Sequence, residues 1–288
     1  MSALVKVSGG LVFSVSKPNY GKQDYGITPQ GPLDWLSFLI AHILIGEPAD
    51  FCGYEIISAP TEFILQQDVI LVITGAEYAN YYCYSVTGSV LQLRHNTVYE
   101  IKAGSRIIMN GKRIGFRTYL LLTNVNIESK QYIGLQRDNF FYSTLSGYSN
   151  VLDVVTGPEF DYLVNPAQVL DTPWQISHLS DTMGVRLNGS SYQLTKYDIL
   201  SSAVCDGTIQ FTKEQPIILL TNRQTIGGYP RVLVVTKLSL CHLAQTPFNK
   251  IIRFQLIDLV VAEQRLQATY QMLAMARIAI QRKILANK

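Results

Sequence analysis

The residues best suited to chemistry stand at the end of an apolar run in the last third of the chain. Residues 215–230 read as a strand that delivers four polar side chains, at positions 222–225, to a glycine-rich turn. A guanidinium is a planar fork of donors that suits a carboxylate or a phosphate, and glycine lets a backbone approach a bound group. The same letters suit a hairpin turn whose polar side chains only cap each other. The candidate site residues of this segment are Arg223, Gln224, Thr225, Gly227, Gly228 and Tyr229.

Two earlier carboxylates, Asp34 and Glu55, are candidates for general acid or base catalysis. Each also has a structural reading, because Asp34 suits the N-cap of a predicted helix and Glu55 suits the edge of a strand. Arg186 stands near a turn, where pairing within the protein explains it as well as contact with a ligand does. The four cysteines and four histidines show no metal-ligand spacing, so the sequence predicts no metal site.

Composition narrows the classes of partner. The 288 residues are 48% hydrophobic and 16% charged, with a net charge of +3. A near-neutral chain without a long basic cluster does not suit nucleic-acid binding. No apolar run reaches the roughly 20 residues that cross a bilayer, and no signal peptide is evident. We therefore expect no nucleic-acid or membrane partner and a cytoplasmic location, and the low charged share predicts apolar surface that a partner protein covers.

Strands dominate the elements that must position these residues in the first half. Residues 4–16 alternate apolar and polar letters, residues 20–33 hold enough Gly and Pro to predict a long loop, and Asp34 precedes a predicted helix over 35–46. Short apolar runs with turn residues between them follow, as in a sandwich or barrel. These predict strands over 54–57, 61–65, 69–74, 79–85, 90–93, 97–101, 106–109 and 117–124.

The second half repeats this character after a weakly patterned connector over 128–150. A tail without Gly or Pro, 259–286, follows a helical period and predicts a terminal helix. The predicted domains are a β-rich lobe over 1–150, a second β-rich lobe over 151–258, and a C-terminal helix over 259–288. In the second lobe we expect strands over 151–155, 174–177, 185–187, 207–211, 217–221, 231–235 and 251–256 and a helix over 238–244.

Four stretches resemble the branch of C subunits within the biotin-dependent carboxyltransferase family. Residues 215–230 keep the family's proline, apolar strand and A-D-R-Q-T-T-G-G-Y-P turn, except for its alanine, its acid and one threonine. Residues 180–189 are similar to S-D-R-M-G-x-R-L-x-G, and residues 200–210 to L-S-x-x-V-x-x-G-x-I-Q. The loop from Gln23 to Asp34 matches Y-Q-x-x-G-V-P-x-S-G-x-x-D. The resemblance covers nearly the whole chain.

The resemblance implies a mostly β fold of two cyclophilin-like β-barrel lobes with a few helices. It also implies the C subunit of an ATP-dependent 5-oxoprolinase, which opens 5-oxoproline to glutamate with an A subunit plus a KipI-like B subunit. Its cofactor would be ATP with Mg²⁺ at the level of the complex, with no biotin on this chain. The alternatives are a carboxyl or carbamoyl transferase of the same family and a non-catalytic regulatory partner of a KipI-like protein. The predicted catalytic residues are Arg223, Gln224, Asp34 and Glu55, and the predicted substrate-binding residues are Thr225, Gly227, Gly228, Tyr229, Gln23 and Arg186.

The chain also departs from the family pattern. Where the family has Q-D-x-G-R before its loop, this chain has Val15-Ser16-Lys17-Pro18-Asn19, so an acid and an arginine are missing. Thr182 replaces a further arginine, and the connector lacks the family's glycine-rich stretch. Because a buried charge that loses its partner is costly, each change is expected to weaken the binding of a charged substrate. The sequence thus predicts a divergent family member with altered chemistry.

Overall fold

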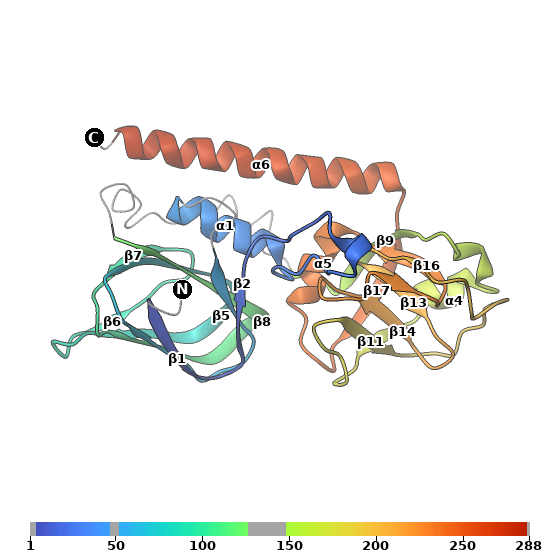
Figure 1. The fold of residues 1–288 in the computed structure, drawn as a ribbon, viewed down its shortest axis with the longest axis horizontal. Coiled ribbons are helices and arrows are strands. Elements are labelled where there is room, and N and C mark those ends of the chain that lie inside the picture. Colours follow the sequence, from blue (N-terminus) through green and yellow to red (C-terminus); the bar gives the residue numbers. More distant parts are fainter. Residues whose placement is uncertain (1–3, 47–51, 126–147, 287–288) are drawn as a thin grey trace. The chain divides into compact units, whose positions relative to one another are not determined.

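The computed structural model describes residues 4–46, 52–125 and 148–286 and contains two compact units, each built mainly of strands (Figure 1). The predicted connector over 128–150 lies almost wholly outside the described residues. The linear domain division into 1–150, 151–258 and 259–288 stays a prediction, whereas the compact units combine segments that are distant in sequence. Unit 1 is Met1–Lys17, Asp34–Gly147 and Tyr270–Lys288, and unit 2 is Pro18–Leu33 and Tyr148–Thr269.

Unit 1 is an eight-stranded sheet organised around two long strands, β5 (Val69–Tyr84) and β8 (Arg106–Asn124). These strands pair antiparallel along their length, with register shifts on either side of Glu77. Such an irregularity bends a strand and increases its twist, which curls the sheet. The order is β1-β4-β8-β3-β2, while β5 pairs with β6, β7 and β8. The other strands are β1 (Val5–Gly9), β2 (Val12–Val15), β3 (Gly53–Ile56), β4 (Thr61–Leu65), β6 (Val90–Gln92) and β7 (Val98–Ile101).

Five predicted strands in unit 1 are corrected. The runs 69–74 and 79–85 belong to the single strand β5, and the runs 106–109 and 117–124 belong to β8. Their polar, glycine-containing middles looked like turns, but each pairs with the other across the bulge. The predicted strand over 4–16 is two strands, because Gly9 and Gly10 both take a positive φ there.

Helix α1 (Trp35–Ile45) confirms the predicted helix of unit 1. The Asp34 side chain accepts a hydrogen bond from the backbone N–H of Ser37, which satisfies a donor at the helix start. Gly46 ends the helix with φ 77°, and its N–H donates to the carbonyl of His42. Because Asp34 fixes the first turn, the cap also fixes where its own carboxylate lies.

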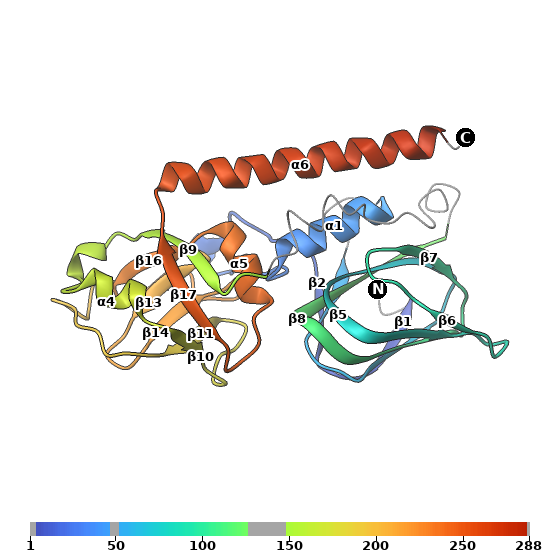
Figure 2. The same cartoon turned by 180° about the vertical axis from the view of Figure 1, so that it is seen from behind.

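Unit 2 is a closed seven-stranded barrel in the order β10-β11-β14-β13-β16-β9-β17 (Figure 2). Its neighbours pair antiparallel except β17 and β9, which are parallel. Trp174 and Phe211 are among the large side chains of its core, which also includes Leu33 from the long loop. The strands are β9 (Val151–Thr156), β10 (Trp174–Ile176), β11 (Gly184–Asn188), β13 (Thr208–Phe211), β14 (Pro216–Leu219), β16 (Arg231–Val235) and β17 (Ile251–Leu256).

Smaller elements surround this barrel. A ribbon of two short strands, β12 (Ser202–Ala203) and β15 (Ile226–Gly227), and a helix α4 (Pro166–Asp171) were not predicted, since they are too short to show a period. The 3₁₀ turns η1 (Gln23–Tyr25) and η2 (Phe160–Tyr162) were also not predicted. Helix α5 (Lys237–Ala244) confirms the predicted short helix.

The tail forms one helix, α6 (Leu259–Ala286), as predicted. Its Tyr270 ring lies 5.3 Å from that of Trp35 in α1, and both residues belong to unit 1. Within the described parts of the chain, no helix combines the length and apolarity that crossing a membrane requires. The mostly β architecture of two barrel-like lobes with a few helices and a terminal helix is confirmed.

Candidate functional site

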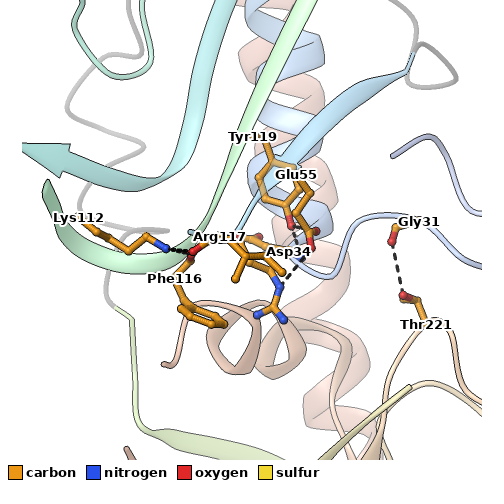
Figure 3. A network of polar contacts seen from close by, with 9 residues as sticks. Gly31, Asp34, Glu55, Lys112, Phe116, Arg117, Tyr119 and Thr221 are labelled. Atoms are coloured by element: carbon orange, nitrogen blue, oxygen red, sulfur yellow. Dashed lines mark hydrogen bonds and ion pairs between the residues drawn. The ribbon is translucent and has the colours of Figure 1, made fainter. Parts of the chain in front are cut away.

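A buried polar cluster in unit 1 contains both predicted carboxylates (Figure 3). Glu55, on β3, accepts a hydrogen bond at Oε2 from the Tyr119 hydroxyl at 2.7 Å, and its Oε1 lies 3.2 Å from Arg117 Nε. The Tyr119 hydroxyl in turn accepts from the backbone N–H of Asp34 at 2.9 Å. All four residues are at most 7% exposed. Tyr119 therefore joins the Glu55 carboxylate to the start of α1.

The Asp34 carboxylate is bonded within its own helix turn. Its Oδ1 accepts from the Ser37 N–H at 3.0 Å and its Oδ2 from the Ser37 hydroxyl at 2.6 Å. This is the cap geometry that its structural reading predicted. A role for Asp34 or Glu55 in catalysis stays a prediction, and any ligand that exchanges a proton with either must reach a buried oxygen.

Arg117 and Tyr119 were missed by the sequence analysis. They lie two residues apart on β8, so they share one face of the sheet, and Tyr119 is the register partner of Glu55. An arginine and a tyrosine at a period of two within an apolar strand were the available signal, but nothing local placed them opposite β3. The pairing comes from residues more than 60 positions apart.

The electrostatics of this cluster keep the tyrosine neutral. Burial raises the pKa of Tyr119 well above its ordinary value, and the nearby carboxylates of Glu55 and Asp34 raise it further. A neutral phenol keeps its proton and donates a hydrogen bond to a carboxylate, while the Arg117 guanidinium supplies a compensating positive charge. The cluster is thus a fixed acceptor, donor and cation in a buried setting.

A second unusual cation, Lys112, lies at the bend of β8. Its ammonium donates to the backbone carbonyls of Ile57 and Phe116 and lies 4.9 Å from the centre of the Phe116 ring (Figure 3). Burial lowers the pKa of Lys112 to about 8, and the charge of Arg117 contributes to this shift. Because its ammonium donates hydrogen bonds to one carbonyl of β8 and one carbonyl just after β3, Lys112 links the bent part of β8 to the segment after β3.

Arg223, in the turn after β14, is directed largely toward the protein. It is 3% exposed, its Nε lies 2.9 Å from Asp206 Oδ1, and its Nη1 donates to the Gln224 carbonyl at 3.1 Å. Asp206, which the sequence analysis missed, precedes the left-handed Gly207 at the entry to β13. The sequence predicts that this guanidinium faces a ligand. In the structure its Nε and Nη1 instead contact groups of the protein itself.

Gln224 is held by a second buried amide. Its Nε2 donates to the Oε1 of Gln210 at 3.2 Å, and Gln210 is 2% exposed. Gly227 leaves the space for this amide, since a Cβ at that position would lie 2.4 Å from Gln210 Nε2. Gln210, at the register shift of β13, is a further residue that the sequence analysis did not single out.

The other predicted residues of the turn stabilise it through their backbones. The carbonyl of Thr225 accepts from the N–H of Val204, and that of Gly228 from the N–H of Ile199. Tyr229 is exposed. The predicted binding roles of these residues stay predictions.

The long loop is attached to this same turn. The N–H of Gln30 donates to the Thr221 carbonyl at 3.1 Å, and the Thr221 hydroxyl donates to the Gly31 carbonyl at 3.4 Å (Figure 3). Gln23 uses its side-chain oxygen within the loop, where it accepts from the N–H of Gly21. Arg186 lies on β11 in the barrel wall. The loop thus belongs to the end of the barrel that carries Arg223.

No group of three His, Cys, Asp or Glu side chains placed to hold a metal ion occurs among residues 4–46, 52–125 and 148–286. The candidate groups are instead carboxylates, a phenol and a guanidinium in unit 1, and amides and a guanidinium in unit 2. These groups suit an organic substrate with charged and amide functions.

Comparison with known families decides the family of this fold. Residues 25–136 and 141–256 match the family model described as carboxyltransferase domain, subdomain A and B. The chain belongs to this carboxyltransferase family. The family assignment confirms the resemblance carried by residues 180–189, 200–210 and 215–230.

Two curated relatives match the chain along most of their own length. The chain is 26% identical to the 5-oxoprolinase C subunit of Escherichia coli K12, over 88% of this chain and 92% of the relative. It is 25% identical to the corresponding 5-oxoprolinase C subunit of Haemophilus influenzae, over 83% and 86%. Identities at this level fit a divergent member.

A solved structure shares the carboxyltransferase fold. The Kluyveromyces lactis urea amidolyase superposes with a TM-score of 0.79 and 17% identity, over 95% of this chain. This chain spans about a fifth of the urea amidolyase chain, which is covered to 20%. The likeness shows that the chain shares its fold with one part of the longer urea amidolyase chain.

Proposed function

We propose that this chain is the C subunit of an ATP-dependent 5-oxoprolinase, acting with A and B subunits to convert 5-oxoproline to glutamate. The observation that carries the proposal is the match with the Escherichia coli C subunit, which extends over 92% of that relative. A shared domain alone would match only part of a relative, whereas this match extends over almost a whole protein. We propose that the complex contains an A subunit together with a KipI-like B subunit.

The chemistry of the reaction sets what a site must supply. A lactam is stable, so its carbonyl must be activated before water can attack, and the negative charge that develops on oxygen must be held by fixed donors. Arg223 and Gln224 are donors whose positions are set by Asp206 and Gln210. We propose that these two residues hold the substrate.

Acid and base steps need a group that takes up or releases a proton. In unit 1, Glu55 is the carboxylate with a neutral phenol and a guanidinium on its two oxygens. We propose Glu55 for this role and Asp34 as the cap that holds the Tyr119 hydroxyl through its backbone N–H.

We assign ATP and its Mg²⁺ to the complex rather than to residues of this chain. The sequence has no G-x-x-x-x-G-K-S/T phosphate-binding loop. The cluster of carboxylates that a bound Mg²⁺ would use is also not found among the described residues.

Reconstitution tests the proposal. The chain is co-expressed with candidate A and B subunits, the complex is purified, and glutamate release from 5-oxoproline is measured with and without ATP. We expect ATP-dependent release only when all three proteins are present. Release that is equal without this chain, or no release from a well-formed three-protein complex, would contradict the proposal.

A further inference from the structure

The ion pair of Arg223 differs from an ordinary buried salt bridge in its alignment. Arg223 Nε and Asp206 Oδ1 are 2.9 Å apart, yet neither atom has a hydrogen bond of acceptable geometry. Nη1 donates a hydrogen bond to the Gln224 carbonyl. Among the described residues, Nη2 of Arg223 has no hydrogen-bond partner. The guanidinium is thus held from one side, and one nitrogen is left for another group.

The backbone that carries Asp206 is rigidly attached on both sides. The N–H of Gly207 donates to the Leu219 carbonyl at 2.8 Å, and the Gly207 carbonyl accepts from Val235 at 2.8 Å. Gly207 has φ +87°, and a Cβ there would lie 2.4 Å from the Val235 oxygen, so the turn requires glycine. The carboxylate is therefore presented to Arg223 from a fixed position.

The charges facing Asp206 come from two elements. Arg223 reaches it from the turn after β14, and Lys237 acts on it from the start of α5. Burial opposes the charged form and raises the pKa of the carboxyl in spite of both cations. The residue next to Arg223 is the neutral Asn222. Asp206 is therefore the one carboxylate paired with Arg223 in the described part of the chain.

We propose that Asp206 is a positioning residue: it fixes the Arg223 guanidinium so that Nη2 is presented to the carboxylate of the bound substrate. The inference rests on the proposed function for its substrate, 5-oxoproline, but not for the Asp206–Arg223 contact itself. A guanidinium held at Nε and Nη1 is oriented before the ligand arrives, which lowers the cost of binding. Asp206 acts through Arg223 and does not touch the substrate.

The first test needs no enzyme activity. The full chain is treated with an arginine-selective dicarbonyl reagent, and modification of Arg223 is followed by peptide mass spectrometry in the wild type and in Asp206→Asn. We expect Arg223 to react about tenfold faster in Asp206→Asn, because reactivity follows the population in which the side chain is released. Asp206→Glu, which restores the charge, should recover part of the protection. An unchanged rate at Arg223 in a folded Asp206→Asn would overturn the inference.

A matched control separates this effect from general loosening of the barrel. Glu159 pairs with Arg231 in the same unit, with Nη2 to Oε1 at 2.7 Å. Glu159→Gln should speed modification of Arg231 and leave that of Arg223 unchanged. If Glu159→Gln exposes Arg223 as much as Asp206→Asn does, the contact has no specific role.

The second test uses the reconstituted complex. Asp206→Asn should raise the KM for 5-oxoproline about tenfold and change kcat less, because it disturbs the group that holds a ground-state carboxylate. Faster modification of Arg223 together with an unchanged KM would overturn the positioning role. If the wild-type complex releases no glutamate, the proposed function fails, whereas the reactivity experiment still decides the Asp206–Arg223 contact.

Discussion

Both units bury an arginine beside a carboxylate, but they do so in different ways. In unit 1 both oxygens of Glu55 are hydrogen-bonded, one by Tyr119 and one by Arg117. In unit 2 the contact between Asp206 and Arg223 is short but poorly aligned, and the buried Nε2 of Gln210 has no hydrogen-bond partner among the described residues.

The difference in hydrogen bonding suggests which cluster stabilises the fold and which one is left to bind a ligand. Buried polar groups are almost always hydrogen-bonded, and those that are not need an explanation. The satisfied network of unit 1 is what a stable fold requires, since it ties β3, β8 and the start of α1 together. The incomplete bonding around Arg223 and Gln210 is what a site retains for a ligand. We therefore expect variants of the Glu55 network in unit 1 to lose stability as well as the proton transfer proposed for Glu55. Variants around Arg223 in unit 2 should lose function with a smaller loss of stability.

The largest effect on stability is expected from Glu55→Ala. It leaves Arg117 buried without its carboxylate, and breaking a buried pair from one side costs about 3–5 kcal/mol. Hydrogen exchange should accelerate in peptides of β3 and β8 and much less in those of β13. The control is Glu62→Ala, whose pair with Arg106 lies on the surface, and it should have a far smaller effect. Equal acceleration in both variants would remove the distinction between the two kinds of pair.

A smaller effect is expected from Gly227→Ala. The new Cβ would lie 2.4 Å from Gln210 Nε2, so the end of this buried amide must shift, which weakens its hydrogen bond to Gln224. We expect a loss of about 0.5–1.5 kcal/mol, the usual value of one hydrogen bond, measured by urea unfolding. Gly228→Ala meets only ordinary contacts at 3.5 Å and should leave stability unchanged. Identical losses in the two variants would contradict the role given to the Gln210 amide.

The smallest effect is expected from Asp206→Asn, as a change in Tm that depends on pH. Burial raises the pKa of this carboxyl above its ordinary value, so the folded state binds the proton more readily than the unfolded chain does. The protonated Asp206 carboxyl therefore favours the folded state. This stabilisation is complete at a pH below the pKa of the unfolded chain and is lost as the pH rises through the pKa of the folded protein. Asp206→Asn, which is always neutral, should therefore raise the Tm slightly at neutral pH and not in strong acid. A Tm that falls at neutral pH would show that the charged pair stabilises the fold, as the pair of Glu55 and Arg117 is expected to do.

The helices were predictable because their signals are local. The N-cap Asp34 and the C-cap Gly46 bracket α1, and the absence of Gly and Pro marks α6 over Leu259–Ala286. The bulged middles of β5 and β8 were not predictable. They contain turn-forming letters, and only pairing with a strand distant in sequence keeps them extended.

The site was predictable in part for the same reason. The sequence alone was enough to single out three residues whose side chains can take part in catalysis or binding: Arg223, Gln224 and Glu55. Their partners could not, because Arg117 meets Glu55 across 62 positions and Asp206 reaches Arg223 from another strand end. The direction of a guanidinium depends on these partners. The sequence could therefore suggest that Arg223 binds a ligand, but it could not predict the contact between Arg223 and Asp206.

The measurement that tests the account most directly is glutamate release per folded molecule by complexes that contain the wild type or Arg223→Lys. Lysine keeps the charge beside Asp206 but lacks the fork, so it cannot make the Gln224 contact and also present a further nitrogen. With both complexes assayed well below their Tm and with 5-oxoproline below its KM, the account predicts ATP-dependent release by the wild type. The rate in Arg223→Lys should be lower by about 10²-fold, because the substrate carboxylate loses its donor, with little change in Tm. Equal rates from two well-folded complexes would contradict it.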